Sequence, residues 1–227
     1  MEVIKTTKLV KIYNDTAAAV KAVDNIDLTI NEGEFTALKG PSGCGKTTLL
    51  NLLGGLDHPT SGNITIKGMD ITSLSSKQLI DFRLKNIGFV FQSYNLIPVL
   101  TAKENVSFIM LLQKKPKAAR EKRAMELLNN VGLKGKENSR PGELSGGQQQ
   151  RVAVARALAS KPAFVLADEP TANLDSHATE NLLDIMAKLN KEENMTFVFA
   201  THDDRVIKKA RRVISLDDGK IINDEQR

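Results

Sequence analysis

Residues 40–47 limit the possible folds of this chain more than any other segment. They read GPSGCGKT, which matches the pattern G-x-x-x-x-G-K-[ST], and they follow the apolar run EFTALK and lead into the helical run TTLLNLLGGL. In this order a strand, a glycine loop and a helix present backbone N–H groups and the positive end of the helix to an anion. The sequence therefore predicts an α/β fold with a phosphate-binding loop at the end of a strand.

The residue types in this loop fit a nucleotide. Gly43 and Gly45 let the backbone curl so that successive N–H groups face one centre. Lys46 supplies a full positive charge to the β- and γ-phosphates, and the Thr47 hydroxyl is a ligand for Mg²⁺. We therefore expect ATP and Mg²⁺ here, with nucleotide contacts from Gly40, Ser42, Gly43, Cys44, Gly45, Lys46, Thr47 and Thr48.

Three further apolar runs, NIGFVFQ, AFVLADE and MTFVFATHD, each end in a polar or acidic residue. Buried parallel strands have this pattern, and function lies at their carboxyl ends. Asp168 is placed to hold Mg²⁺ through water, and Glu169 to polarise a water in line with the γ-phosphate. His202 could hydrogen-bond the γ-phosphate, and the Gln92 amide could ligate Mg²⁺ or the attacking water. An acidic strand end without a role and a structural histidine are the alternatives.

The remaining order of the chain indicates one domain with two parts. Residues 1–92 and 161–227 carry the strand patterns of an α/β core with a largely parallel sheet. Residues 93–160 show helical periodicity, with a predicted capping box at Thr101 and Glu104 and no convincing strand. We interpret this stretch as a helical lobe inserted into the core.

Composition excludes several classes of protein. The chain has 227 residues, 41% of them hydrophobic and 26% charged, which is usual for a globular protein in water. Its net charge of +5 is spread along the sequence without interleaved aromatic residues, so nucleic acid is not expected as a partner. The single cysteine excludes an internal disulfide. No apolar run approaches the roughly 18 residues that span a bilayer, so we expect a cytoplasmic protein without direct membrane insertion.

The segment ELSGGQQQRVAVARAL, residues 143–158, resembles half of a second anion site. Ser145 and Gln148 fit a helix capping box, which is the simpler interpretation. However, Gly146 and Gly147 in the first turn cost about 1 kcal/mol each relative to alanine, and they leave N–H groups open to a phosphate. Because no lysine is present, the rest of the nucleotide must be held elsewhere. A second copy of the chain, turned head to tail, would supply it in a two-fold dimer.

The motifs LSGGQ, GPSGCGKTT, VLADEP and ATHD, in their order along the chain, resemble the ATP-binding cassette subunit of ABC transporters over essentially the whole sequence. The resemblance implies a P-loop NTPase cassette of the α/β class. Its mainly parallel core sheet is joined by an N-terminal antiparallel β subdomain and an inserted helical lobe. It also implies an ATP-dependent homodimer and ATP hydrolysis that drives an integral membrane permease, with the cassette peripheral on the inner face of the cell membrane.

The resemblance assigns roles to individual positions. Tyr13 would stack on the adenine, and Asp175 would lie in the loop that meets the opposite subunit. Gln92 would join the two lobes, Glu169 would be the catalytic base and His202 the switch histidine, with Lys46 completing the catalytic set. Cys44 replaces the commoner serine, and its position at a helix N-terminus beside Lys46 favours a thiolate whose alkylation would block ATP binding.

The runs GFVFQSYNLIPVLTAKENV and LADEPTANLDS are similar to the branch of lipoprotein-release, macrolide-export, antimicrobial-peptide-resistance and cell-division cassettes. This similarity implies an exporter or extractor of lipoprotein, peptide or drug. The alternative is a mechanotransmission ATPase that controls an extracytoplasmic enzyme without transport. A soluble DNA-repair or translation cassette is disfavoured because the chain has neither a long inserted coiled coil nor a second cassette.

Overall fold

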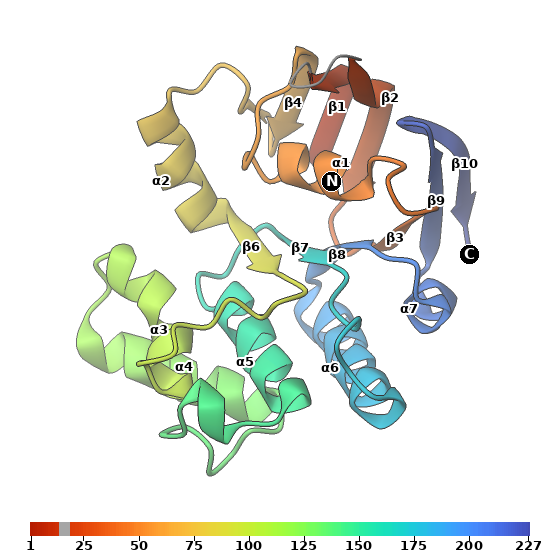
Figure 1. Cartoon of the computed structure of the whole chain (residues 1–227). Coiled ribbons are helices and arrows are strands. Elements are labelled where there is room, and N and C mark those ends of the chain that lie inside the picture. Colours follow the sequence, from red (N-terminus) through yellow and green to blue (C-terminus); the bar gives the residue numbers. More distant parts are fainter. Residues whose placement is uncertain (14–18) are drawn as a thin grey trace.

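The computed structural model describes residues 1–13 and 19–227, which form two sheets and a set of helices around them (Figure 1). The smaller sheet is antiparallel, with the strand order β2 (Val20–Asn31), β1 (Glu2–Tyr13), β4 (Ser61–Ile66) and β5 (Met69–Asp70). Apolar side chains on its inner face, such as Ile4 and Ile64, are buried. This sheet is the antiparallel part that the sequence predicts.

The larger sheet is the core of the molecule. Its strand order is β10 (Lys220–Gln226), β9 (Arg212–Asp217), β3 (Phe35–Lys39), β8 (Thr196–Ala200), β7 (Phe164–Asp168) and β6 (Ile87–Val90). The strands from β9 to β6 run parallel, and only β10 pairs antiparallel. Every residue of β8 is buried, which agrees with a strand that is covered on both faces. The carboxyl ends of β3, β8, β7 and β6 therefore share one edge, called here the carboxyl edge.

Each face of the large sheet has its own apolar core. On one face α1 (Lys46–Leu53) lies between the two sheets, and its leucines pack with Ile4, Leu166 and Val198. On the other face Val165 and Phe197 pack with α6 (Ser176–Glu193), α7 (Asp204–Lys209) and the helices that follow β6. Helix α2 (Ser76–Asn86) leads into β6 at the margin of the first core. The arrangement confirms an α/β fold with a mainly parallel sheet.

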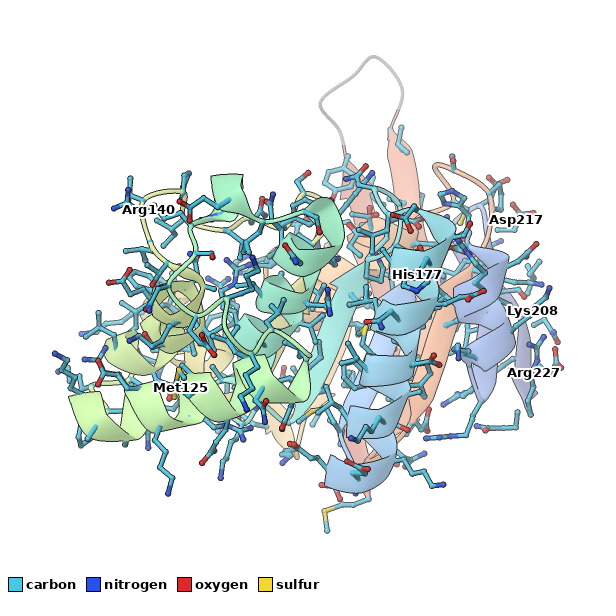
Figure 2. The ribbon with its side chains drawn as sticks, turned by 90° about the horizontal axis from the view of Figure 1, so that it is seen from below. Met125, Arg140, His177, Lys208, Asp217 and Arg227 are labelled. Carbon is cyan, nitrogen blue, oxygen red and sulfur yellow. The ribbon has the colours of Figure 1, made fainter. Side chains whose placement is uncertain are left out.

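Between β6 and β7 the chain is helical. This stretch contains α3 (Ala102–Leu112), α4 (Lys117–Asn130), the short 3-10 helix η1 (Pro141–Glu143) and α5 (Gly146–Leu158). The predicted capping box begins α3, because Thr101 accepts from the Glu104 N–H while Glu104 accepts from the Thr101 N–H at 2.8 Å. Helix α5 packs against both α3 and β6, so this lobe adjoins the β6 side of the large sheet. Figure 2 shows α4 and α6 with outward side chains, including Met125 and His177.

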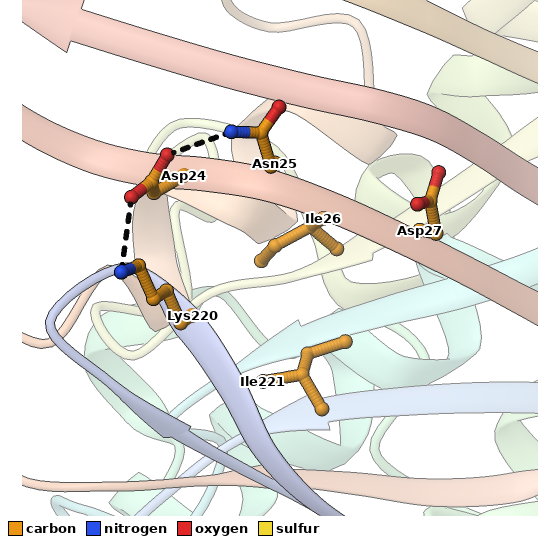
Figure 3. Close-up of a pocket in the computed structure, with 6 residues that line it drawn as sticks. All are labelled: Asp24, Asn25, Ile26, Asp27, Lys220 and Ile221. Atoms are coloured by element: carbon orange, nitrogen blue, oxygen red, sulfur yellow. Dashed lines mark hydrogen bonds and ion pairs between the residues drawn. The ribbon is translucent and has the colours of Figure 1, made fainter.

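The two sheets meet where β2 passes β10 (Figure 3). The Asp24 N–H donates to the Gly219 carbonyl at 2.8 Å, and the Asp24 carboxylate pairs with Lys220 at 3.4 Å. A hollow of about 400 Å³ lies beside this pair, lined by Asp24, Asn25, Ile26, Asp27, Lys220 and Ile221. These contacts form the seam between β2 and β10, and they hold β2 close to the glycine loop.

Within residues 1–13 and 19–227, none of the helices combines the length and the apolar character required to cross a bilayer.

Candidate nucleotide site

The predicted phosphate loop, residues 40–47, connects β3 to α1 in a shape that needs its glycines. Gly43 and Gly45 have φ of 82° and 103°, in the left-handed region that side chains disfavour. A Cβ atom on Gly45 would lie 2.1 Å from the Ala22 carbonyl oxygen, and one on Gly40 would lie 2.3 Å from the Leu216 carbonyl oxygen. A Cβ on Gly43 would meet nothing within 4 Å, so the loop is open on that side. Packing therefore requires two of the glycines, and backbone conformation requires the third.

Lys46 and the first turn of α1 place positive charge at this loop. Lys46 Nζ donates to the Gly40 and Pro41 carbonyls at 2.7 and 2.9 Å, and the residue is only 8% exposed. Gly45 is the N-cap of α1 and supplies no side-chain acceptor, so the first N–H groups of the helix have no side-chain cap. A cation and uncapped helix donors are thus combined where a phosphate would bind.

Thr47 meets Asp168 across the sheet, with its hydroxyl 3.1 Å from Asp168 Oδ1. Burial raises the pKa of Asp168, and the neighbouring Glu169 charge adds to this rise, whereas the Thr47 hydrogen bond and the Lys46 charge oppose it. Hydroxyl and carboxylate oxygens are the hard ligands that Mg²⁺ prefers. No group of three or more His, Cys, Asp or Glu side chains in the described parts of the chain could hold a metal. The pair therefore fits an ion whose remaining ligands are phosphates and water.

Glu169 lies just beyond β7 in a strained backbone conformation, with φ of 43°. Its N–H donates to the Ala200 carbonyl at 2.9 Å, which extends the pairing of β7 with β8. Its carboxylate meets His202 Nδ1 at 2.7 Å and the Thr201 hydroxyl at 3.1 Å, both at the end of β8. The Glu169 side chain is 16% exposed and that of His202 is 72% exposed. The Glu169 carboxylate is thus held by Thr201 and His202, while the His202 imidazole is exposed to solvent.

Gln92 stands two residues beyond β6, at the same edge, and is exposed. Its carbonyl accepts a hydrogen bond from Asn173 at 3.0 Å, and Arg156 donates to the Tyr94 carbonyl at 2.8 Å and to the Asn95 carbonyl. Backbone carbonyls therefore anchor this loop. In the described structure no hydrogen bond engages the Gln92 side-chain amide.

The LSGGQ segment forms the beginning of α5. Ser145 and Gln148 make the capping box, with the Gln148 N–H 3.3 Å from Ser145 Oγ and the Ser145 N–H 2.9 Å from Gln148 Oε1. A Cβ on Gly146 would lie 2.8 Å from the Tyr94 hydroxyl, and one on Gly147 would lie 3.0 Å from the Ala178 Cβ. The glycines therefore have a packing role that the sequence did not reveal. Among the described residues no hydrogen bond joins this segment to the phosphate loop of the same chain.

Tyr13 ends β1, and its hydroxyl donates to Asp57 at 2.7 Å. Lys11 Nζ lies 4.7 Å from the centre of the ring and 2.7 Å from Asp57 Oδ1. One face of the ring thus carries a cation, and an adenine would have to stack on the other.

The expectation for the Cys44 thiol is not supported. Cys44 is 4% exposed, and its sulfur lies in the core beneath the loop, 3.9 Å from Lys46 Nζ. A sulfur buried among apolar side chains is slow to meet an alkylating reagent. Only the backbone of Cys44 can face a phosphate.

Four residues of the site were not found from the sequence. Thr201 holds Glu169, Asn173 and Arg156 hold the loop that carries Gln92, and Gln150 is completely buried between α5 and the carboxyl edge. All four lie within segments quoted above, but their contacts run to main-chain atoms or to a neighbouring carboxylate, which the sequence pattern does not reveal.

Three features define a P-loop NTPase. A glycine loop follows β3, an acidic pair lies at the end of β7, and a histidine follows β8, which lies between these two strands. Comparison with known proteins makes the class more specific. The family described as ABC transporter matches residues 23–172. The chain belongs to the ABC transporter family and is a cassette-type ATPase domain of it.

Relatives and solved structures agree with this assignment. The lipoprotein-releasing system ATP-binding protein LolD 1 of Rhodopseudomonas palustris is 47% identical over 222 residues, covering 97% of this chain and 98% of the relative. The macrolide export ATP-binding/permease protein MacB of Mannheimia succiniciproducens is 44% identical over 227 residues, but the chain spans only 35% of its length. The dimeric post-hydrolysis structure of the ATP-binding cassette MJ0796 with ADP and Pi, from Methanocaldococcus jannaschii, matches with a TM-score of 0.90 at 42% identity, covering 98% of both chains.

Proposed function

We propose that this chain is the ATP-binding and ATP-hydrolysing subunit of an ABC transporter, which powers a separate membrane permease. The observation that carries the proposal is the convergence, at one sheet edge, of Lys46, the Thr47–Asp168 pair and the Glu169–His202 pair. The match to cassettes over almost the full chain supports it.

The proposed chemistry is the cleavage of the bond between the β-phosphate and the γ-phosphate. Lys46 and the N–H groups of the phosphate loop bind and orient the phosphates. Thr47 and Asp168, together with Gln92, would hold Mg²⁺, which supplies charge neutralisation at the phosphates when it is bound. Glu169 accepts a proton from the attacking water while the water oxygen bonds to the γ-phosphorus, and ADP leaves. His202 Nδ1 fixes one carboxylate oxygen and leaves the exposed imidazole able to reach the γ-phosphate.

We further propose that two copies assemble head to tail. The start of α5 presents Ser145, Gly146 and Gly147, and no hydrogen bond among the described residues joins it to the phosphate loop of its own chain, so in the dimer it would complete the partner's site. Asp175, the N-cap of α6, lies in the loop expected to meet the other subunit. The relatives' structure is described as dimeric with ADP and Pi, which supports this arrangement.

The permease would dock beside the helical lobe, residues 93–160, which we propose moves as a unit against the core. An apolar hollow of about 420 Å³ lies between α2, β6 and α3, lined by Leu56, Ile80, Arg83, Leu84, Ile87, Phe89, Ile109 and Leu112. Ile80 and Leu112 both line this hollow and are 55% and 50% exposed, so it presents apolar surface to the outside. The proposed occupant is a short cytoplasmic helix of the permease. The cassette would thereby lie on the inner face of the membrane without inserting.

The relatives' names indicate the class of work. LolD 1 is named for lipoprotein release and MacB for macrolide export and for a permease part. The proposed task is therefore export or extraction of a lipoprotein, peptide or drug. Mechanotransmission to an extracytoplasmic enzyme remains the second candidate, because the same ATPase site and the same docking hollow would serve transport and mechanotransmission alike.

Co-purification tests the proposal. Tagged Glu169→Gln protein, held with Mg·ATP, is recovered from solubilised membranes, and the associated proteins are identified by mass spectrometry. We expect one integral membrane protein in fixed ratio, lost in Ile80→Asp and kept in Met125→Asp, which alters an exposed side chain on α4 outside the hollow. Recovery of nucleic acid or ribosomes instead, with no membrane protein, would contradict it.

A further inference from the structure

Gln150 lies in the second turn of α5, and its side chain is completely buried. Its Nε2 donates to the Pro170 carbonyl at 2.7 Å and lies 3.5 Å from the Phe91 carbonyl oxygen. Pro170 directly follows Glu169, and Phe91 directly precedes Gln92. One amide therefore joins α5 to both loops of the carboxyl edge that carry proposed reacting or metal-binding groups.

Stability alone does not account for a glutamine at this position. Its Oε1 is buried and has no hydrogen-bond partner among the atoms of the described residues. An orphaned buried acceptor destabilises the folded state, and a leucine or methionine of similar size would remove it. The position nevertheless carries an amide whose donor end is fully engaged. The donor contact is thus what distinguishes glutamine from an apolar residue here.

The segment that Gln150 holds is strained. Glu169 has φ of 43°, and such a conformation persists only where the surroundings over-determine it. Two backbone hydrogen bonds fix Glu169 from its own sheet and turn, one from its N–H to the Ala200 carbonyl and one from the Ala172 N–H to its carbonyl at 3.2 Å, in addition to the contacts of its carboxylate. The Gln150–Pro170 hydrogen bond is the fixing contact that comes from the helical lobe.

We propose that Gln150 is a positioning residue that aligns Glu169 for hydrolysis and ties this alignment to the placement of α5. Helix α5 begins with Ser145, Gly146 and Gly147. A phosphate bound at the start of α5 would therefore influence Glu169, at the end of β7, through the helix and the Gln150–Pro170 hydrogen bond. The inference rests on the proposed role of Glu169 as the catalytic base.

The first test is Gln150→Leu, with Gln149→Leu as the matched control. Gln149 is the adjacent glutamine, and among the described residues its side-chain amide donates to the Leu144 carbonyl alone, at 3.1 Å. We expect Gln150→Leu to lower kcat at least about tenfold while KM for ATP changes by less than about threefold, because a misplaced base affects the chemical step and not ground-state binding. A kcat for Gln150→Leu within twofold of the control would overturn the proposal.

A double-mutant cycle separates positioning from general damage. In a Glu169→Gln background, slow single-turnover hydrolysis should be unchanged by adding Gln150→Leu, because the residue acts through Glu169. An equal loss in both backgrounds would mean an independent structural effect and would overturn the proposal. Native-like hydrolysis by Glu169→Gln alone would instead contradict the proposed function of Glu169, so the two failures are distinguishable.

Gln150→Glu keeps the shape and provides a second variant if Gln150→Leu does not fold. A carboxyl buried here has a raised pKa, and its neutral form can donate to the Pro170 carbonyl, whereas its ionised form cannot. The activity of Gln150→Glu relative to the native protein should therefore rise as pH falls from 8 to 6. A flat ratio would count against the hydrogen bond as the acting contact.

Discussion

At the carboxyl edge two consecutive carboxylates, Asp168 and Glu169, occupy different surroundings. Asp168 continues the strand and meets Thr47, and burial raises its pKa. Glu169 turns away into a left-handed conformation and is held by Thr201 and His202. The change of backbone between them points the adjacent side chains in different directions, which suits the separate roles proposed for them, Asp168 at Mg²⁺ and Glu169 at the attacking water.

Asp203 offers a test of the electrostatics beside this site. Arg205 donates to its carboxylate and, with a hydrogen bond from Thr171, lowers its pKa from 3.8 to about 2. Because the folded-state pKa is depressed, the stabilisation is present above about pH 4 and is lost as pH falls toward 2. We expect Asp203→Asn to lower the free energy of unfolding by about 1 kcal/mol at pH 6, after discounting for solvent screening of a partly exposed pair.

Urea unfolding of native protein and Asp203→Asn at pH 6 and pH 3 measures this difference. The difference in the free energy of unfolding between the native protein and Asp203→Asn should be smaller at pH 3 than at pH 6. Asp218→Asn is the control, because no ion pair or hydrogen bond engages that carboxylate in the described structure, and it should show a small, pH-independent change. A gap that widens toward pH 3 would refute the assignment.

At the scale of single elements, α5 shows how three consecutive glutamines acquire different positions. Gln148 closes the capping box, Gln149 turns back to the Leu144 carbonyl, and Gln150 is buried against the carboxyl edge. The capping box could be predicted because it depends on spacing alone. The burial of Gln150 could not, because it depends on where β6 and β7 end in space. The reason for glycine at position 146 also escaped prediction, since Tyr94 lies far away in the sequence.

The start of α5 provides a prediction of its own. Ser145→Arg should reduce hydrolysis by at least about 100-fold, because it fills the surface that would complete the partner's site, while each monomer still binds one ATP. Ser75→Arg is the matched control, since Ser75 caps α2 with the same box toward Gln78 and lies outside the site. Steady-state ATPase rates and equilibrium binding of a fluorescent ATP analogue distinguish the two steps. Loss of ATP binding by the Ser145→Arg monomer would contradict the assignment.

At the scale of the whole molecule, two cores on opposite faces of one sheet must stay in register for the site to form. Arg212 on β9 connects the parts, because it donates to Glu34, to Asp224 on β10 and to the Thr29 carbonyl on β2 at 2.7–2.9 Å. Hydrogen bonds to Asp224 and to Glu34 raise the pKa of Arg212. The residue is 9% exposed, so its charge belongs to a buried network.

Removing this guanidinium should be costly. Arg212→Leu removes the cation that pairs with Glu34 and Asp224, and we expect a loss of about 3 kcal/mol in the free energy of unfolding. Lys220→Leu, which removes a 63% exposed partner of Asp24, should cost less than about 1 kcal/mol. Chemical denaturation of both variants at pH 7 makes the comparison, and equal losses would show that the buried network does not join the sheets as described.

Much of the architecture could be predicted because its signals are local. The glycine loop, the apolar runs with polar ends and the helical period between residues 93 and 160 each specify their own element. The antiparallel edge strand β10 and the seam between β2 and β10 were not visible, because they depend on pairing between distant segments. The buried state of Cys44 was missed for the same reason, since a helix N-terminus alone does not reveal what packs beneath it.

The mass of Glu169→Gln protein in solution, measured by light scattering with and without Mg·ATP, tests the two-chain nucleotide site most directly. We expect a monomer without nucleotide and a dimer of twice that mass with ATP, at micromolar protein, because binding is intact and hydrolysis is slowed. Adding Ser145→Arg to Glu169→Gln should restore the monomer. A monomer under all conditions would contradict the two-chain nucleotide site.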